Sequence, residues 1–512
     1  MIRDRIINSF HESRITNHVS RITFHASRFT FHASRFNPMN VRTEHFIGDS
    51  TAAVQNKTLQ TRLRVINSFT VMRNRAFADL PDGEALRDRA RQIKEETISN
   101  LESYLTQLEE NVVRLGGTVH WARDGDEACA IVLDLARKNQ VKRVVKSKSM
   151  VTEEIELNEA LESAGIEAVE TDLGEYIVQL AHEKPFHILA PAVHKSRGDI
   201  AELFAEKLGA MNLKEAEEMT AVARKALREK FCTADMGITG ANFGIADTGT
   251  IVLVENEGNI RLSTSLPRIH VAVMGIEKVI PRLEDLAVFL RILARSASGQ
   301  KMSSYVSLVS GPRREGEADG AAEFHLIILD NGRTRILADE EMREALYCLR
   351  CGACLNVCPV YKKIGGHAYG SVYSGPIGSI LTPAFAGLET TKDLPFASTL
   401  CGACREICPV RIDIPRILLK LRSDWSEGKT AGARPSFIER LAIRLWAVAM
   451  RSTAIYNFAF RAGAFLQRPL LDDGRLKRLP FVFAAWTKNR DFPALAKKSF
   501  RETWRDELGK KR

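Results

Sequence analysis

The stretch "CLRCGACLNVCP" (residues 348–359) decides the fold of the region around it, because it packs four cysteines into eleven residues. These cysteines follow one another at intervals of three, three and four residues, at Cys348, Cys351, Cys354 and Cys358. The 512-residue chain has only nine cysteines, which is too few for a scaffold held together by disulfides. Clustered thiols in such a chain indicate a metal site in a reducing compartment, and we therefore expect a cytoplasmic protein.

The cysteine spacing discriminates between two kinds of metal site. Structural zinc usually takes two pairs of cysteines, or one pair of cysteines with one pair of histidines. The pattern C-x2-C-x2-C-x3-C-P is instead the run found in bacterial ferredoxins, where three thiolates hold one iron–sulfur cubane and the fourth reaches a second. A second group, "CGACREICP" (residues 401–409), repeats most of this run. Two such runs favour two iron–sulfur clusters, expected to be [4Fe–4S], over zinc.

The ferredoxin exchange of ligands divides the seven clustered thiols into two sets. Cluster 1 is expected to take Cys348, Cys351, Cys354 and Cys408, and cluster 2 to take Cys358, Cys401 and Cys404. Cluster 2 then lacks a fourth thiolate, and Ser398 stands where a complete run would carry a cysteine. Three forms of cluster 2 stay open: a [3Fe–4S] cluster, ligation by the Ser398 oxygen, or an iron open to solvent or to a partner.

A long insertion separates the two cysteine groups. Its 42 residues between Cys358 and Cys401 include the glycine-rich "GGHAYGSVYSGPIGS" (residues 365–379). An insertion of this length predicts a surface loop against which another subunit docks. His367 lies in it, and we interpret this histidine as a solvated loop residue rather than as a ligand.

Ahead of the cysteines, short apolar runs alternate with amphipathic stretches, after a helical stretch at residues 84–117. This alternation is typical of a layered α/β domain with a largely parallel sheet. Strands are expected at 118–122, 141–147, 166–171, 187–192, 305–311 and 324–332, and helices at 126–139, 152–165 and 198–209. Residues 250–259 and 268–276 look like a hairpin pair, which would make the sheet mixed.

The glycine-rich stretch "GITGANFGIADTG" (residues 237–249) has two interpretations. It is not G-x-G-x-x-G, so it is neither a dinucleotide fingerprint nor a phosphate-binding loop. Tight turns that require glycine and a binding loop fit it equally well. Nearby polar residues are those that an anion- or carboxylate-binding cleft needs, namely Asp247, Glu255, Asn256 and Asn259. No Ser-His-Asp or metal-type histidine pattern is recognised, so catalytic residues stay unassigned.

The two ends of the chain differ from the middle. Residues 13–36 carry a near-exact seven-residue repeat with too thin an apolar stripe to build a core, so residues 1–38 are excluded from the fold and Met39 is a plausible start. The remaining parts are an α/β domain at 60–335, a helical dicluster domain at 339–422 and a basic helical region at 430–512. No run of eighteen apolar residues predicts a membrane span, although a net charge of +10 is compatible with peripheral membrane contact.

Four segments of the sequence together resemble the lactate utilisation protein B family over about residues 60–512. They are "GITGANFGIADTGTIVLVENEGNIRLSTSLPRIHVAVMGIEK", "CLRCGACLNVCPVY", "GGHAYGSVYSGPIGSILTP" and "STLCGACREICPVRIDIP". The resemblance implies a LUD-type α/β domain related to CoA-transferase-like folds, followed by two [4Fe–4S] clusters on the seven cysteines. It also implies partners in a bacterial lactate-oxidising complex, namely a second iron–sulfur or cysteine-rich protein and a second LUD-domain protein.

The motifs favour an electron carrier over a complete dehydrogenase, because cysteine runs occur without a flavin or nicotinamide fingerprint. We therefore expect an iron–sulfur electron-transfer subunit that supports oxidation of L-lactate to pyruvate. One alternative is a redox subunit for another 2-hydroxy acid or for a disulfide substrate. The other is an iron–sulfur regulator that binds nucleic acid through the basic tail, which is disfavoured because no DNA-reading module is recognised.

Overall fold

The computed structural model describes residues 39, 41–430, 432–433, 437–479, 484, 487 and 490–508. These residues pack as two units, one ending at Asp424 and one beginning at Trp425. The heptad repeat at residues 13–36 lies outside the described residues, so its interpretation stays a prediction.

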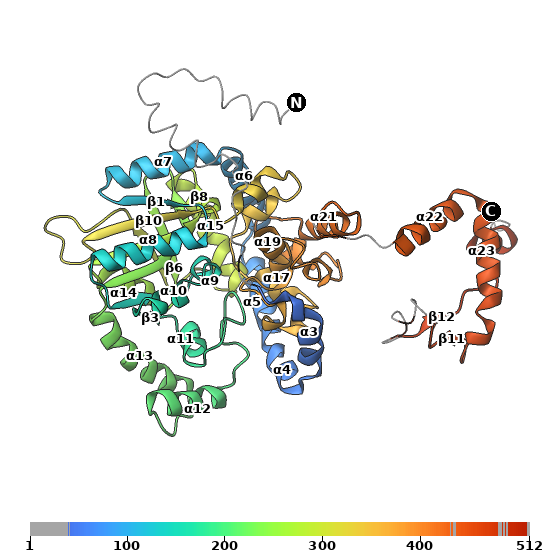
Figure 1. The fold of residues 1–512 in the computed structure, drawn as a ribbon, viewed down its shortest axis with the longest axis horizontal. Helices are drawn as coiled ribbons and strands as arrows, with labels where there is room; N and C mark the ends of the chain where they lie inside the picture. Colours follow the sequence, from blue (N-terminus) through green and yellow to red (C-terminus); the bar gives the residue numbers. More distant parts are fainter. Residues whose placement is uncertain are drawn as a thin grey trace, which may run out of the picture. The chain divides into compact units, whose positions relative to one another are not determined.

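A six-stranded parallel sheet forms the centre of the first unit (Figure 1). Its strand order is β1-β10-β7-β4-β2-β3, and every neighbouring pair is parallel. The strands are β1 (Thr118–Ala122), β2 (Arg143–Lys146), β3 (Glu167–Glu170), β4 (Met236–Gly240), β7 (Ile269–Gly275) and β10 (Glu323–Leu329). Parallel neighbours need crossover connections, which helices between the strands supply here.

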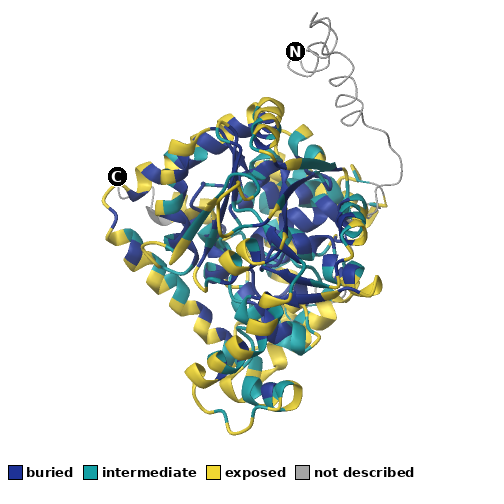
Figure 2. Ribbon diagram, turned by 90° about the vertical axis from the view of Figure 1, so that its left-hand side faces the viewer, coloured by how far each residue is buried: buried dark blue, intermediate teal, exposed yellow. Residues whose placement is uncertain are grey.

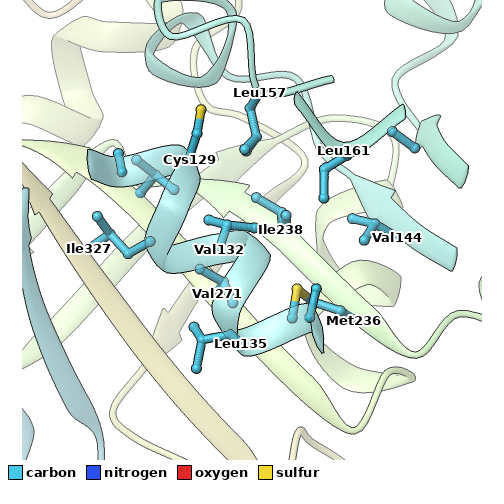
Figure 3. Close-up of a cluster of buried hydrophobic side chains, with 14 of the residues drawn as sticks. Cys129, Val132, Leu135, Val144, Leu157, Leu161, Met236, Ile238, Val271 and Ile327 are labelled. Atoms are coloured by element: carbon cyan, nitrogen blue, oxygen red, sulfur yellow. The ribbon is translucent and has the colours of Figure 1, made fainter. Parts of the chain in front are cut away.

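Both faces of this sheet are buried beneath helices, because successive side chains of a strand point to opposite faces. Val144 of β2 lies in one hydrophobic core and Val145 in the other. The first core, shown in Figure 3, is covered by α8 (Gly125–Lys138), α9 (Met150–Glu154) and α10 (Leu157–Ser163). The second core is covered by α11 (Leu173–Leu180), α12 (Arg197–Leu208) and α13 (Ala216–Cys232). Figure 2 shows buried strands surrounded by helices with exposed outer faces.

The two cysteines outside the motifs have different surroundings. Cys129 packs in the first core, with its thiol 3.4 Å from the carbonyl oxygen of Ile155 (Figure 3). Cys232 is exposed at the end of α13. A cysteine outside a motif usually behaves as a small buried hydrophobe, and of these two Cys129 does so and Cys232 does not.

A second sheet carries the antiparallel pairs. It has the order β8-β5-β6-β9 and consists of β5 (Phe243–Ile245), β6 (Thr250–Glu255), β8 (Val279–Ile280) and β9 (Tyr305–Val309). The predicted hairpin between 250–259 and 268–276 is wrong, because β6 and β7 belong to different sheets. Helix α14 (Asn259–Ser265) intervenes, and it begins where Glu255 accepts hydrogen bonds from the amides of Ile260 and Arg261. The α/β class with both parallel and antiparallel pairs is confirmed.

The strand predicted at residues 187–192 is also absent from the structure. The segment folds back on itself, since the Phe186 amide donates to the Pro191 carbonyl at 2.9 Å. The His187 Nδ1 accepts hydrogen bonds from the amides of Leu189 and Ala190, at 3.0 and 3.2 Å. These local bonds replace the ladder that a strand would need.

Two positions explain the glycines of residues 237–249. A Cβ on Gly237 would lie 1.8 Å from the Ser263 carbonyl oxygen, so α14 can approach β4 only over glycine. Gly249 has a φ of +69°, in the left-handed region that favours glycine. The interpretation of this stretch as glycine-dependent turns holds at Gly249, whereas Gly237 lies within β4 and is required by the close approach of α14.

Helices from the N-terminal part of the first unit pack against the cysteine region. They are α3 (Phe46–Gln55), α4 (Lys57–Arg62) and α5 (Ile66–Ala78). The Thr70 hydroxyl on α5 donates to the Asn356 carbonyl at 2.9 Å, within the first cysteine group. The helix predicted at 84–117 is two helices, α6 (Gly83–Ser99) and α7 (Leu101–Arg114), divided at Asn100. Helix α15 (Leu283–Ala297) packs against α5 and α6.

The cysteine region is a set of short helices. They are α16 (Arg333–Ala338), α17 (Ala353–Val357), α18 (Tyr361–Ile364), α19 (Gly375–Ala386), α20 (Ala403–Ile407) and α21 (Ile414–Ser426). The insertion between the cysteine groups is not the predicted surface loop, because it forms α18 and α19 and is largely buried. Ile380, Leu381 and Phe385 on α19 are fully buried. Burial of these apolar side chains makes the insertion part of the core, although its glycines favour a loop.

The second unit contains α22 (Phe437–Arg451), α23 (Thr453–Leu466), β11 (Arg475–Leu476), β12 (Phe492–Pro493) and α24 (Phe500–Thr503). Within the basic region predicted to be helical at 430–512, α22 and α23 are divided at Ser452, whose side chain caps α23. Among the described residues, no helix combines the length and apolar character needed to cross a bilayer.

Candidate iron–sulfur site

The two CGAC segments form the same local structure. Each has a glycine with positive φ, +75° at Gly352 and +84° at Gly402, which starts the short helices α17 and α20. Each helix ends at a cysteine whose sulfur accepts a backbone amide, from Tyr361 to Cys358 at 3.5 Å and from Ile412 to Cys408 at 3.4 Å. Helices α17 and α20 pack against each other, so the two cysteine groups lie side by side.

The four thiols assigned to cluster 1 come together. Cys348, Cys351, Cys354 and Cys408 line one small cavity, whose other walls are mostly apolar and include Leu349, Ala353, Ile377, Val410 and Ile412. Cys408 reaches this cavity from the second group, as exchange of ligands between two ferredoxin runs requires. Burial raises the pKa of the Cys351 thiol to about 12. A group bound here must therefore displace protons from the thiols.

The three thiols assigned to cluster 2 are also neighbours. Burial, and then the proximity of Cys358, raises the pKa of Cys404 to about 12, and Cys401 adds to the shift. Cys358 and Cys404 are buried, whereas Cys401 is exposed. The second set therefore includes an exposed thiol, whereas in the first set Cys408 is buried and the other three cysteines are half-buried.

Ser398 occupies the place that corresponds to Cys348. The Arg350 amide donates to the Cys348 sulfur at 3.4 Å, and the Leu400 amide donates to the Ser398 hydroxyl at 3.1 Å. Arg350 and Leu400 share a positive φ, +60° and +55°. The hydroxyl of Ser398 thus stands in the local geometry of a ligand sulfur.

The Thr399 hydroxyl, which is not among the predicted site residues, lies beside the thiols assigned to cluster 2. A backbone hydrogen bond from Ala403, followed by one from the Thr399 side chain, lowers the pKa of the Cys401 thiol. The only sequence signal for this hydrogen bond is the position of Thr399, two residues before Cys401.

The spacing of the thiols fits a cluster better than a single ion. Among the described residues, only Glu183, His194 and His367 form a set of three or more His, Cys, Asp or Glu whose ligating atoms all lie within 4.8 Å of one another. A single zinc ion with bonds of about 2.3 Å needs its sulfurs about 3.8 Å apart. The cysteine sets are wider than this.

His367 is exposed, as predicted, but it is held in place. Its Nε2 lies 2.8 Å from the Lys184 carbonyl oxygen, and its ring packs edge-on against Phe186. The nearby Glu183 carboxylate already contacts His194 at 2.7 Å and Lys195 at 2.6 Å. These contacts account for the three side chains without a metal.

Basic side chains of α6 hold the loop that carries Cys408. Arg87 donates to the Cys408 carbonyl at 2.9 Å through Nη2 and at 3.2 Å through Nε. Arg91 donates to the Arg411 carbonyl at 2.6 Å. These bonds fix the backbone beside the Cys408 sulfur and would place positive charge near a cluster held by thiolates.

A buried ion-pair network joins the α/β part to the first cysteine group. Arg333 forms two hydrogen bonds of 2.8 Å to the Glu154 carboxylate, and its Nε donates to Glu277 at 2.7 Å. Tyr373, from the insertion, donates to Glu154 at 2.6 Å. Burial opposes ionisation of Glu277, but Arg333 and Arg350 outweigh it and hold its pKa at about 2.

A polar cavity of about 330 Å³ lies at the carboxyl ends of the parallel strands, where open α/β sheets bind ligands. Residues that follow β2, β3, β4 and β7 line it, and so does Cys351. Glu255, Asn256 and Asn259, predicted from the sequence, lie in its wall. Asp247 does not, because it accepts the Leu283 amide at 3.3 Å elsewhere.

Several residues of this cavity carried no sequence signal. The only feature of the sequence that distinguishes Arg350 is its position between two motif cysteines. Ser147 and Lys278 follow buried strands, and nothing in their local sequence distinguishes them. Burial lowers the pKa of Lys278 to about 8.

Comparison with known proteins identifies three family models along the chain. The LUD domain matches residues 105–329, a 4Fe-4S dicluster domain matches residues 344–412, and the model named "Lactate utilisation protein B, C-terminal" matches residues 421–508.

Curated relatives cover most of the chain. A lactate utilization protein B from Bacillus cereus (strain B4264) is 47% identical over 434 residues, 85% of this chain and 91% of the relative. Proteins of the same name from Bacillus thuringiensis (strain Al Hakam) and Bacillus anthracis (strain CDC 684 / NRRL 3495) are 46% identical, with the same coverage. Among solved structures, a DUF162 family protein from Deinococcus radiodurans matches with a TM-score of 0.26 and 13% identity, over 45% of this chain and 98% of that one.

Proposed function

Because the chain belongs to the lactate utilisation protein B family, we propose that it is the iron–sulfur electron-transfer subunit of a system that oxidises L-lactate to pyruvate. The observation that carries this proposal is the grouping of seven thiols into two adjacent sets in and around α17 and α20, beside the LUD domain. A role in lactate utilisation follows from the family. Electron transfer and the substrate L-lactate are the finer steps that we assign.

We propose that each set of thiols holds one cluster. Cluster 1 takes Cys348, Cys351, Cys354 and Cys408 and is [4Fe–4S], and cluster 2 takes Cys358, Cys401 and Cys404. The backbone geometry shared by Cys348 and Ser398 supports Ser398 at the fourth corner of cluster 2. When bound, the clusters supply one-electron transfer.

The positions of Cys351 and Cys401 support a direction for this electron transfer. Cys351 of the first set lines the cavity of the α/β domain, and the second set includes the exposed Cys401. Packing of α17 on α20 keeps the two sets adjacent. We infer that electrons enter near Cys351 and leave near Cys401, toward a partner protein.

The partners that we propose are a second iron–sulfur or cysteine-rich protein and a second LUD-domain protein, in the cytoplasm. The second unit offers a surface for them, because many large apolar side chains of α22 and α23 are exposed. Phe437, Trp446 and Phe458 are 77%, 62% and 75% exposed. Exposed apolar patches of this kind mark protein contacts.

Metal analysis of anaerobically purified protein tests the proposal. The protein should be brown and contain iron and acid-labile sulfide, and Cys351→Ser should lose the iron of one cluster. Cys232→Ser is the matched control, because Cys232 is exposed and remote from the motifs in sequence. Stoichiometric zinc without sulfide would show that the proposal is wrong.

A further inference from the structure

Three hydrogen-bond donors in the wall of the 330 Å³ cavity have no partner among the residues that the structure describes. They are the Lys278 amine, the Nη1 group of Arg350 and the Ser147 hydroxyl. The Arg350 side chain is 9% exposed and Ser147 is 1% exposed. A buried donor without a partner is unfavourable, so Arg350 Nη1 and the Ser147 hydroxyl favour a bound acceptor. The half-buried Lys278 adds a cation to the same wall.

The acidic groups of the cavity are already engaged. Glu255 accepts the first amides of α14, at 2.7 and 3.0 Å, and Glu257 at the mouth accepts the Leu173 amide at 3.0 Å. Asp172 accepts the Gly174 and Glu175 amides at the start of α11, at 3.0 and 3.2 Å. Glu277 is held by Arg333 at 2.7 Å and by Arg350 at 3.4 Å. The groups left free are therefore donors, two of them cationic, and they select an anion.

The size and position of the cavity narrow the ligand further. Its volume lies at the lower end of the range of about 300–1,000 Å³ for small-molecule sites. Asn256, Glu257 and Gln300 are exposed and mark its mouth, whereas Cys351 lies in its wall. A small organic anion therefore fits, next to a proposed cluster ligand.

We propose that this cavity binds a short 2-hydroxy or 2-oxo carboxylate, with its carboxylate on Lys278 and Arg350 and its neighbouring oxygen on Ser147. A carboxylate offers two oxygens to the two cations, and the 2-oxygen matches the third donor. Lactate and pyruvate belong to this class, so the inference deepens the proposed function and rests on it for the choice of probe.

A competing role for the two cations is to neutralise the thiolates alone. Lys278 and Arg350 both interact electrostatically with Cys348. The two roles differ in a measurable way. An anion bound beside Cys351 must lower the reduction potential of cluster 1, and reduction of cluster 1 must weaken binding by the same free energy. Neutralisation alone predicts no effect of a ligand.

The experiment uses the anaerobically purified, full-length, cluster-loaded chain with pyruvate as the probe, in isothermal titration calorimetry. Lys278→Met should weaken pyruvate binding at least about tenfold, which corresponds to 1.4 kcal/mol. Ser147→Ala should weaken binding of pyruvate but not of propionate, which lacks the 2-oxygen. Lys225→Met is the matched control, because Lys225 is exposed on α13.

A redox titration followed by electron paramagnetic resonance supplies the second readout. Pyruvate should lower the potential of cluster 1 in the wild type and leave it unchanged in Lys278→Met. Absence of pyruvate binding, equal binding by Lys278→Met, or sulfate binding as tightly as pyruvate each overturns the inference. If the chain carries clusters that lactate reduces in the assembled system but does not bind pyruvate, the inference alone fails. A chain without clusters instead overturns the proposed function.

Discussion

The guanidinium of Arg350 lies 3.4 Å from the carboxylate of Glu277, so a residue between two motif cysteines pairs with the 3-10 helix (Ile276–Lys278) that follows β7 of the parallel sheet. Arg333 contacts the other oxygen of the same carboxylate at 2.7 Å. The α/β part and the first cysteine group are thus joined by one shared charge. This contact fixes the cavity and the thiol-lined site as neighbours.

Glu277→Gln should destabilise this junction strongly. Removing one charge from a buried pair leaves its partners uncompensated, at a cost of about 3 kcal/mol. We expect a lower urea midpoint for release of the clusters, followed by visible absorbance. Glu315→Gln, on an exposed carboxylate, is the control and should leave the midpoint unchanged. Equal midpoints for wild type and Glu277→Gln would mean that the network does not hold the two parts together.

Ser398→Cys should protect cluster 2 from oxidation. A thiolate is a softer ligand than a hydroxyl oxygen and binds iron more strongly, so the variant should convert to a three-iron form more slowly than the wild type. It should also have a lower reduction potential for cluster 2, because the thiolate adds negative charge. Electron paramagnetic resonance during a mild oxidative titration measures both effects.

Cys351→Ser, in the other set of thiols, is the control for Ser398→Cys and should leave the oxidation-sensitive signal in place. If the wild type and Ser398→Cys lose iron at the same rate, Ser398 is not at the open corner and the division of ligands is wrong.

The stability of the α/β domain should fall below neutral pH. Burial, and then the nearby His325, lowers the pKa of His270 from 6.5 to about 3. Below about pH 6.5 this histidine is protonated in the unfolded chain but stays neutral in the folded chain. The free energy of unfolding therefore decreases as pH falls below 6.5. One unit below that pKa, His270 alone costs about 1.4 kcal/mol.

The variant His270→Gln should lose about 1.4 kcal/mol less than the wild type between pH 7.5 and 5.5, measured by urea unfolding. His45→Gln, on an exposed helix end, should keep the wild-type pH dependence. A His270→Gln profile parallel to that of the wild type would contradict the assignment.

Trp446→Glu should weaken assembly with the partner proteins without loss of iron, because it puts a charge into the exposed apolar surface of α22. Co-purification from cells grown on lactate measures assembly, and iron analysis of the same sample measures the clusters. Lys497→Ala changes an exposed polar residue of the same unit and should assemble normally. Normal assembly of Trp446→Glu would remove α22 from the interface.

The sequence predicted local features well, because their signals lie within a few residues. The ferredoxin spacing and the alternation of strands and helices are of this kind. The insertion after Cys358 was misjudged because its glycines suggested a loop, although Ile377, Ile380 and Phe385 supply a buried face.

Only some residues of the cavity could be predicted from the sequence, because the others are brought together by the order of the strands in the sheet. Glu255, Asn256 and Asn259 follow one strand and stand out as a polar group. Ser147, Lys278 and Arg350 come from distant segments, and the sequence alone does not reveal that the parallel strands end at one edge. The hairpin prediction is wrong for the same reason. β6 and β7 belong to different sheets, and long-range packing decides which sheet each strand joins.

The central claim is that electrons from L-lactate pass through two clusters on this chain. Rapid-freeze electron paramagnetic resonance of the complex assembled with its partner proteins, mixed anaerobically with L-lactate, tests it most directly. We predict that signals of both reduced clusters appear at least as fast as pyruvate is formed. Formation of pyruvate while both clusters on this chain stay oxidised would contradict the account.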